Sequence, residues 1–180
     1  PIQIPGTNWA KYTSGGSKTM AAIKTDGTLW TWGRNLYGST GHNNTTGGST
    51  GISSPTQVPG TTWNYVITNA RSMGVKTDGT LWSWGFNNCG ALGLNQANGG
   101  SISSPTQIPG TTWDTKFTTS GAYTNGVIKT DGTLWMWGLN GAGQLGQGNT
   151  TKYSSPVQVP GTTWAAIDCS SDVVKATKTD

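Results

Sequence analysis

The chain has 180 residues, of which ten are tryptophan and 28 are glycine, and it carries a formal net charge of +4. Glutamate is absent while glycine, serine, threonine and asparagine dominate, so the composition disfavours long helices and suits short strands joined by tight turns. The basic residues are scattered rather than clustered, and no segment is apolar enough to cross a membrane, so we expect neither a nucleic-acid partner nor membrane insertion.

The chain opens with a pattern, Pro-x-Gln-x-Pro-Gly-Thr-x-Trp, that occupies residues 1–9 and recurs at 55–63, 105–113 and 156–164. Proline lacks the N–H group that a central strand must donate, so each copy predicts a short edge strand that ends at a Pro-Gly turn. Two serines precede the later copies but not the first one. We therefore expect the chain to begin within a repeat.

The next constant stretch is Lys-Thr-Asp-Gly-Thr-Leu-Trp-x-Trp-Gly, at residues 24–33, 76–85 and 129–138, and its first three residues return at 178–180. Asp-Gly predicts a two-residue hairpin turn, because glycine accepts a positive φ and aspartate tolerates one. The alternation after the turn places both tryptophans on one face of a strand and the leucine on the other. With a further strand after the preceding tryptophan, as at 10–13, each unit contains four short strands.

A glycine-rich segment follows each hairpin, at residues 35–41, 87–93 and 140–146, and leads into a stretch of variable length. The longest of these stretches contains His42, Asn43 and Asn44. Variable length and small polar residues are typical of a surface loop, where a scaffold leaves room for function.

A period near fifty residues with four strands per unit is the signature of a repeat array, and a propeller blade is the unit that fits it. We therefore predict an all-β fold, a partial β-propeller of four-stranded blades that fills residues 1–180 as a single domain. Each blade needs a neighbour to bury its tryptophans, whose indole N–H groups would bond to backbone carbonyls. The repeat units are approximately 10–63, 64–113 and 114–164, with incomplete units at 1–9 and 165–180.

The motif Asp-Gly-Thr-Leu-Trp-x-Trp-Gly-x-Asn-x-x-Gly-Gln-Leu-Gly, followed by a proline-bearing strand, resembles the repeat of the regulator of chromosome condensation family. Residues 131–146 match it best, and the likeness covers the chain in about three and a half repeats. Ser39 and Thr40 depart from its Gln-Leu pair, and the glycine-histidine pair common before the hairpin is missing. The resemblance implies a seven-bladed β-propeller, of which this chain supplies about half a ring. We expect that the chain is a segment of a longer protein or that copies assemble to complete the ring.

The residues give no support to catalysis, a cofactor or a metal site. His42 is the only histidine, no nucleophile motif accompanies it, and four of the seven aspartates are explained by hairpin turns. Cys89 and Cys169 belong to no Cys-x-x-Cys or Cys/His spacing. We predict that the protein is not an enzyme. The nucleotide-exchange activity known in the resembling family is not carried over, because the matched residues are all scaffold.

The candidate partner contacts are large side chains that break the repeat, together with residues of the variable loops, because variable aromatic and arginine side chains beside one set of loops would anchor an interface. Drift on an unselected surface explains them equally well. The candidates are Arg34, Tyr37, His42, Asn43, Asn44, Phe86, Asn95 and Leu139.

We interpret the chain as a non-enzymatic binding or structural module that presents its loops to a protein partner or to other copies of itself. Near-identical repeats, low charge and small polar loops favour display outside a cell, on a cell surface or on a virion. One alternative is an intracellular regulatory interaction domain of the exchange-factor kind. Another is lectin-like carbohydrate binding, in which tryptophans would stack on sugar rings.

Overall fold

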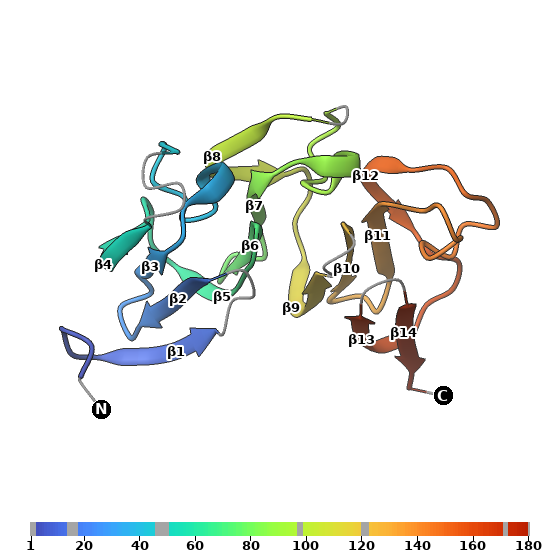
Figure 1. The fold of residues 1–180 in the computed structure, drawn as a ribbon. Helices are drawn as coiled ribbons and strands as arrows, with labels where there is room; N and C mark the ends of the chain where they lie inside the picture. Colours follow the sequence, from blue (N-terminus) through green and yellow to red (C-terminus); the bar gives the residue numbers. More distant parts are fainter. Residues whose placement is uncertain are drawn as a thin grey trace.

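The structure is an arc of four β-sheets that follow one another along the chain (Figure 1). It is a computed structural model, and it describes residues 3–13, 18–45, 51–96, 99–119, 123–170 and 173–179. Three sheets have four antiparallel strands and the last has two, so the predicted all-β fold of four-stranded blades is confirmed. Within the described ranges, no helix is long and apolar enough to span a membrane.

Each four-stranded sheet, called a blade here, takes its strands in chain order and begins at the tryptophan of Gly-Thr-x-Trp. Blade 1 contains β1 (Trp9–Thr13), β2 (Thr19–Lys24), β3 (Leu29–Gly33) and β4 (Ile52–Gln57). Blade 2 contains β5 (Trp63–Thr68), β6 (Arg71–Lys76), β7 (Leu81–Phe86) and β8 (Ser101–Ile108). Blade 3 contains β9 (Trp113–Thr119), β10 (Thr124–Lys129), β11 (Leu134–Gly138) and β12 (Tyr153–Gln158). The two-stranded sheet contains β13 (Trp164–Ser170) and β14 (Val173–Lys178), and short 3-10 turns follow β3 and β7 as η1 (Leu36–Gly38) and η2 (Asn88–Gly90).

The hairpin between the second and third strands of each blade closes with a three-residue loop, so the predicted two-residue turn is wrong. In blade 1 the Lys24 N–H donates to the Thr28 carbonyl and the Gly27 N–H donates to the Lys24 carbonyl, both at 3.0 Å. Gly27 alone in this loop is left-handed, with φ +78°. A type I turn followed by a left-handed glycine is the next most common way to close a hairpin. The glycine prediction therefore holds, whereas the aspartate needs no positive φ.

The aspartate of this loop fixes the strand that follows it. Asp26 Oδ1 accepts hydrogen bonds from the N–H of Thr28 at 3.0 Å and from its hydroxyl at 2.7 Å. The hydroxyl of Thr28 in turn accepts one from Trp30 Nε1 at 2.9 Å. Blades 2 and 3 repeat this chain of bonds around Asp78 and Asp131. Because hydrogen bonds favour the ionised carboxylate, the pKa of each of these aspartates is lowered.

The proline-bearing strands β4, β8 and β12 lie on the outer side of the arc, and β1, β5, β9 and β13 lie on its inner side (Figure 1). Among the described strands, each outer strand pairs with only one neighbour. Pro55, Pro105 and Pro156 fall at irregular points of these ladders and have no paired residue, so the prediction of edge strands is confirmed for these three copies. It is wrong for the first copy, whose described residues 3–8 form no strand.

One fully buried tryptophan crosses each boundary between complete blades. Trp84 of blade 2 lies in a cluster with apolar side chains of blade 1 that include Val58, and its Nε1 donates to the Ser39 carbonyl at 2.9 Å. Trp137 of blade 3 lies in the matching cluster with blade 2, and its Nε1 donates to the Ala91 carbonyl at 3.0 Å. The predicted indole-to-carbonyl bonds are confirmed at these two positions.

The tryptophans that begin the blades have a different environment. Trp63 and Trp113 are 2% and 3% exposed, and a lysine ammonium lies over each ring. Lys129 Nζ is 4.5 Å from the Trp113 ring centroid and 4.6 Å from that of Trp135, which is cation–π geometry. In the described part of the chain, no acceptor reaches the Nε1 of Trp63 or Trp113. The predicted carbonyl partner is therefore wrong for these two indoles.

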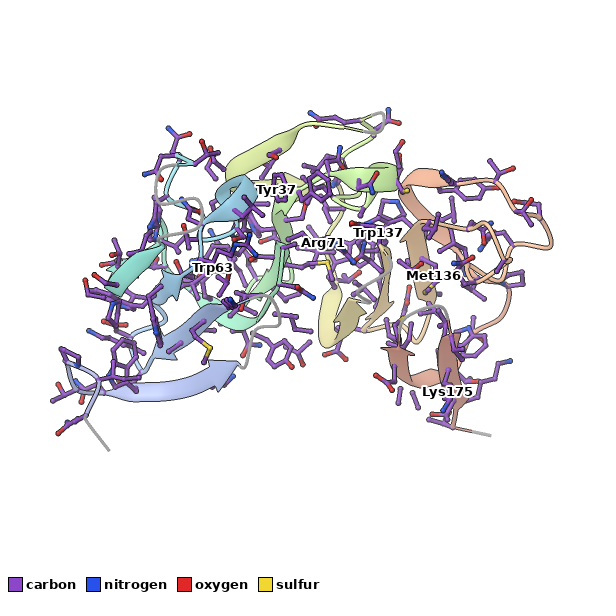
Figure 2. The ribbon with its side chains drawn as sticks, in the orientation of Figure 1. Tyr37, Trp63, Arg71, Met136, Trp137 and Lys175 are labelled. Carbon is purple, nitrogen blue, oxygen red and sulfur yellow. The ribbon has the colours of Figure 1, made fainter. Side chains whose placement is uncertain are left out.

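The hairpin β13–β14 packs on the far side of blade 3. Its Trp164, Ile167 and Val174 are partly buried against a cluster that includes Met136. Met136 and Trp137 are neighbours in β11 and lie on opposite faces of the blade, one toward β13–β14 and the other toward blade 2 (Figure 2).

Candidate partner-binding surface

Three aromatic side chains from three successive blades form a continuous row, called the aromatic row here: Tyr37, Phe86 and Tyr123. Tyr37 stacks on Phe86 with ring centroids 4.2 Å apart and planes 20° apart. Phe86 meets Tyr123 edge-on, with centroids 6.0 Å apart and planes at 69°. Tyr37 keeps 36% of its surface exposed, and the other two are half-buried. A partner that lies along the row would contact all three complete blades.

Strained backbone conformations hold two of these rings in place. Tyr37 and Tyr123 are left-handed, with φ of +63° and +68°, a conformation that bulky residues rarely adopt. Beside Tyr37, Gly38 lies so close to Ser103 of β8 that a side chain there would collide with it. The contact between η1 and the next blade therefore sets Tyr37 over blade 2. Cys89 and Lys18, at the equivalent positions of other blades, are also left-handed, with φ of +56° and +68°, so this conformation belongs to the repeat scaffold.

Arg71 lies behind the row, between blades 2 and 3 (Figure 2), and is 4% exposed. Its guanidinium carbon is 5.4 Å from the centroid of the Tyr123 ring, and its Nε donates to Asn125 Oδ1 at 3.2 Å. Burial lowers the pKa of Arg71 to about 10, so the side chain is still positive at neutral pH. The row is thus backed by a fixed positive charge, which favours partner groups that are acidic or rich in carbonyl oxygens.

Arg34 and Leu139 lie at the same end of their blades as Phe86. The N–H groups of Arg34, Phe86 and Leu139 each donate to the segment before the second strand, at 2.9, 3.1 and 3.1 Å. For Leu139 the acceptor is the carbonyl of Tyr123. The structure therefore places four of the predicted contact residues, these three and Tyr37, at or beside the aromatic row.

The other four predicted residues lie in loops away from the row, and two of them bond to the next blade. The N–H of Asn43 donates to the Ser103 carbonyl of β8 at 2.7 Å, and that of Asn95 donates to the Ser154 carbonyl of β12 at 2.8 Å. Both asparagines are left-handed, with φ of +54° and +55°. Asparagine tolerates this conformation better than most residues, so these two positions are explained by the scaffold.

His42 and Asn44 stabilise the same loop of blade 1. His42 is half-buried with its Nε2 3.1 Å from Thr31 Oγ1, and burial lowers its pKa. The carbonyl and Oδ1 of Asn44 accept hydrogen bonds from Asn35 Nδ2 at 3.1 and 3.0 Å. The structure does not bring these residues to the aromatic row.

The side chains of the aromatic row are suited to non-covalent contacts with a partner. Among the residues that the structure describes, no three His, Cys, Asp or Glu side chains gather where they could hold a metal ion. Aromatic faces over a buried guanidinium can bind a partner through stacking, hydrogen bonding and charge.

Comparison with known proteins identifies the repeat family of this chain. A model of the Regulator of chromosome condensation (RCC1) repeat matches residues 78–119 and 131–176, and a second RCC1 repeat model matches residues 11–39. The chain belongs to the RCC1 repeat family. The resemblance found in the hairpin motif is thereby confirmed.

The RCC1 repeats recur in much larger proteins. The human E3 ubiquitin-protein ligase HERC2 is 30% identical over 152 residues, which are 81% of this chain and 3% of HERC2. Human WBSCR16 has a TM-score of 0.79 at 21% identity, covering 98% of this chain and 46% of its own.

Yeast RCC1 (Prp20) is similar in two structures. Bound to Kap60, it has a TM-score of 0.80 at 16% identity over 96% of this chain and 43% of its own. A structure of Prp20p from Saccharomyces cerevisiae, described with its binding properties to Gsp1p and histones, has a TM-score of 0.74 and covers 89% and 40%. This chain therefore corresponds to about half of an RCC1 propeller, as predicted.

Sequence reasoning missed Arg71 and Tyr123 as members of the surface. Both stand just before or at the start of a second strand, where RCC1 repeats commonly carry a glycine-histidine pair. The available signal for Arg71 was its place in the repeat, because it pairs with the glycine of Trp-x-Trp-Gly where the other two blades have Thr19 and Thr124.

Proposed function

We propose that this RCC1 repeat chain is a non-enzymatic protein-interaction module whose partner binds along the aromatic row. The observation that carries the proposal is the unbroken contact from Tyr37 through Phe86 to Tyr123, with Arg71 behind it. Aromatic and arginine side chains dominate the binding energy of protein interfaces. Because the stacking of the rings on one another fixes them before binding, little side-chain freedom would be lost on association.

The relatives support a regulatory interaction domain over display on a cell surface or virion. HERC2 is a ubiquitin-protein ligase, and Prp20 is seen with Kap60 and described with Gsp1p and histones. Protein binding is what we propose for this chain. Their individual partners are not carried over, because the chain spans 3% of HERC2 and less than half of Prp20.

Affinity capture followed by mass spectrometry tests the proposal in an extract of the cells that make the protein. The double variant Tyr37→Ser/Phe86→Ser removes two rings of the row, and Ile4→Ser removes an exposed apolar side chain elsewhere, 44% exposed. A partner captured by the original chain and by Ile4→Ser should bind the double variant at least roughly tenfold more weakly. Equal capture by all three proteins, with unchanged circular dichroism, would refute the assignment of the row.

A further inference from the structure

A cavity of about 250 Å³ lies between blades 2 and 3, where the loop that follows η2 meets the hairpin of blade 3. Its wall is mostly apolar and includes Leu94, Pro109, Trp113, Trp135 and Pro156. Lys129 also lines the cavity and ends β10, whereas Tyr123 of the aromatic row stands just before that strand. The cavity is therefore at the opposite end of blade 3 from the row and does not belong to the surface described above.

Hydrogen bonds between the two blades hold the rim of the cavity in place. The Asn95 N–H donates to the Ser154 carbonyl of β12 at 2.8 Å, and Ser155 Oγ donates to Asn95 Oδ1 at 3.2 Å. Gly93 brings the start of this loop against blade 3, because its φ is +72° and an added Cβ would lie 2.8 Å from Trp137 Nε1. The cavity is thus formed by the scaffold itself, so a ligand need not order the loop.

The residue after the last glycine of each glycine-rich segment distinguishes this loop from its equivalents. Blade 1 has His42 there and blade 3 has Gln147, and both side chains bond to their own blade. His42 Nε2 is 3.1 Å from Thr31 Oγ1, and Gln147 Nε2 donates to the Gln158 carbonyl at 3.0 Å. Leu94 of blade 2 packs instead against the cluster between blades 2 and 3. It supplies an apolar wall where the other two loops carry polar side chains.

One positive charge lies in these apolar surroundings. Lys129 Nζ is within 4.6 Å of the ring centroids of both Trp113 and Trp135. Among the residues that the structure describes, this ammonium donates no hydrogen bond and forms no ion pair. The carboxylate of Asp131, two residues along the chain, accepts its hydrogen bonds from Thr133 instead. The three N–H donors of the ammonium are therefore available to an anionic ligand.

The lysine of blade 3 is also placed differently from that of blade 2. A Cβ added at Gly60, in the Pro-Gly turn before blade 2, would be 3.4 Å from Lys76 Nζ. At Gly110, in the turn before blade 3, the three nearest atoms, out to 3.7 Å, all belong to Trp113. Lys129 thus lies farther from its turn than Lys76 does, and blade 2 offers a matched control for the role of the charge.

We propose that this cavity binds a small aromatic monocarboxylate, a free acid whose ring lies a few bonds from its carboxylate. The carboxylate accepts a charge-assisted hydrogen bond from the Lys129 ammonium. The ring packs against Leu94 and the two prolines of the wall. No step of this binding involves the aromatic row, so the proposal is independent of the proposed protein partner.

The size and shape of the cavity favour a ligand of this class. Apolar cavities of about 150 Å³ bind benzene, so the volume found here holds one such ring together with a short carboxylated chain. The rings of Trp113 and Trp135 meet at 77° with centroids 6.1 Å apart. A third ring can extend this edge-to-face arrangement, which favours an aromatic acid over an aliphatic one.

Two-dimensional NMR of the indole N–H groups tests the proposal on the 180-residue chain, with 3-phenylpropionate as the probe. The signals of Trp113 and Trp135 should shift with a dissociation constant of about 1 mM or below. Those of Trp63 and Trp82, the equivalent pair of blade 2, should not shift. The uncharged 3-phenylpropanamide should bind roughly tenfold more weakly than the acid. Absence of shifts, equal shifts in both pairs, or equal binding of acid and amide would overturn the proposal.

The tripeptide Gly-Gly-Phe separates a free acid from the end of a polypeptide chain, because its last residue carries the same ring and carboxylate. The volume of the cavity is filled by the ring and its short chain, so the two glycines should weaken binding relative to 3-phenylpropionate. Tighter binding of the tripeptide would overturn the assignment to a free acid.

Three variants locate the ligand. Lys129→Met keeps an apolar stem over the indoles but removes the charge, and it should weaken binding of 3-phenylpropionate roughly tenfold or more. Lys76→Met removes the same charge from blade 2 and should leave binding unchanged. Leu94→His introduces the residue that blade 1 carries in the same loop, and it should weaken binding by removing the apolar wall. If Lys129→Met unfolds by circular dichroism, Leu94→His decides. Undiminished binding by a folded Lys129→Met or Leu94→His chain would overturn the proposal.

Discussion

Replacing Trp137 by alanine is the sharpest test of how the blades hold one another. Trp137 is 0% exposed, lies in the cluster between blades 2 and 3, and donates from Nε1 to the Ala91 carbonyl at 3.0 Å. A tryptophan buries about 150–250 Å², which at about 25 cal/mol per Å² gives an upper bound of about 4–6 kcal/mol. Measured losses for such truncations are about 3–5 kcal/mol. The Ala91 carbonyl still accepts a bond from Asn125 Nδ2 at 2.7 Å, so no acceptor is orphaned.

Trp135→Ala is the matched control, because Trp135 lies two residues before Trp137 in β11 and its side chain is on the same face of the strand. Trp135 is only half-buried, and its Nε1 donates to Thr133 Oγ1 within its own blade at 2.9 Å. We expect its loss to lower the free energy of unfolding by about 2 kcal/mol less than that of Trp137. Urea denaturation followed by circular dichroism measures both. If Trp135→Ala lowered the free energy of unfolding more than Trp137→Ala, the indoles that cross the blade boundaries would not be the main interaction that stabilises the packing of the blades.

Three further outcomes follow from the same structure. Hydrogen bonds lower the pKa of Asp131 below its ordinary 3.8. The ionised carboxylate therefore stabilises the fold above about pH 4, and this stabilisation is lost as the pH falls through the folded-state pKa. In thermal melts, Asp131→Asn should make the melting temperature fall less steeply with acid. Gly138→Ala should lower the free energy of unfolding by about 3 kcal/mol, because φ is +103° and the new Cβ would collide with the backbone before β10. Gly141→Ala is the control: its Cβ would meet nothing within 4 Å, and it should change stability by less than about 0.5 kcal/mol. Arg71→Met should destabilise less than Arg71→Ala in urea denaturation, because both remove the buried charge but methionine fills more of the volume. The opposite order would show that filling this volume does not stabilise the contact between the two blades.

Much of the fold could be predicted because its decisive signals are local. Two prolines around a glutamine exclude a central strand, and an alternating Trp-x-Trp run after a glycine turn specifies a strand with one apolar face. The type of hairpin turn was the one local feature predicted wrongly. Glycine is required both in a two-residue turn and at the end of a three-residue one, so Asp26-Gly27 alone does not distinguish them. The hydrogen bond from the Lys24 N–H to the Thr28 carbonyl, which decides the matter, depends on the pairing of the whole hairpin.

The candidate surface was only partly predictable, because it is assembled from residues far apart in the chain. Tyr37 and Phe86 were found as breaks in the repeat, but their stacking depends on η1 docking against β8. Asn43 and Asn95 hold the same position in two loops, and their left-handed backbone and their bonds to the next blade explain them. A loop residue can therefore either contact a partner or join two blades, and only the geometry separates the two.

The pair of tryptophans in each hairpin shows why one repeat cannot specify its own fold. The alternation puts both indoles on the same face, and the sequence around them is nearly the same. In the structure one indole donates to a threonine of its own hairpin, as Trp82 does to Thr80, while the other crosses to the preceding blade, as Trp84 does to Ser39. The second indole needs a carbonyl and a glycine about forty-five residues earlier in the chain, so its burial exists only when two blades are folded together. Stability of this kind is a property of neighbouring blades together and not of a single repeat.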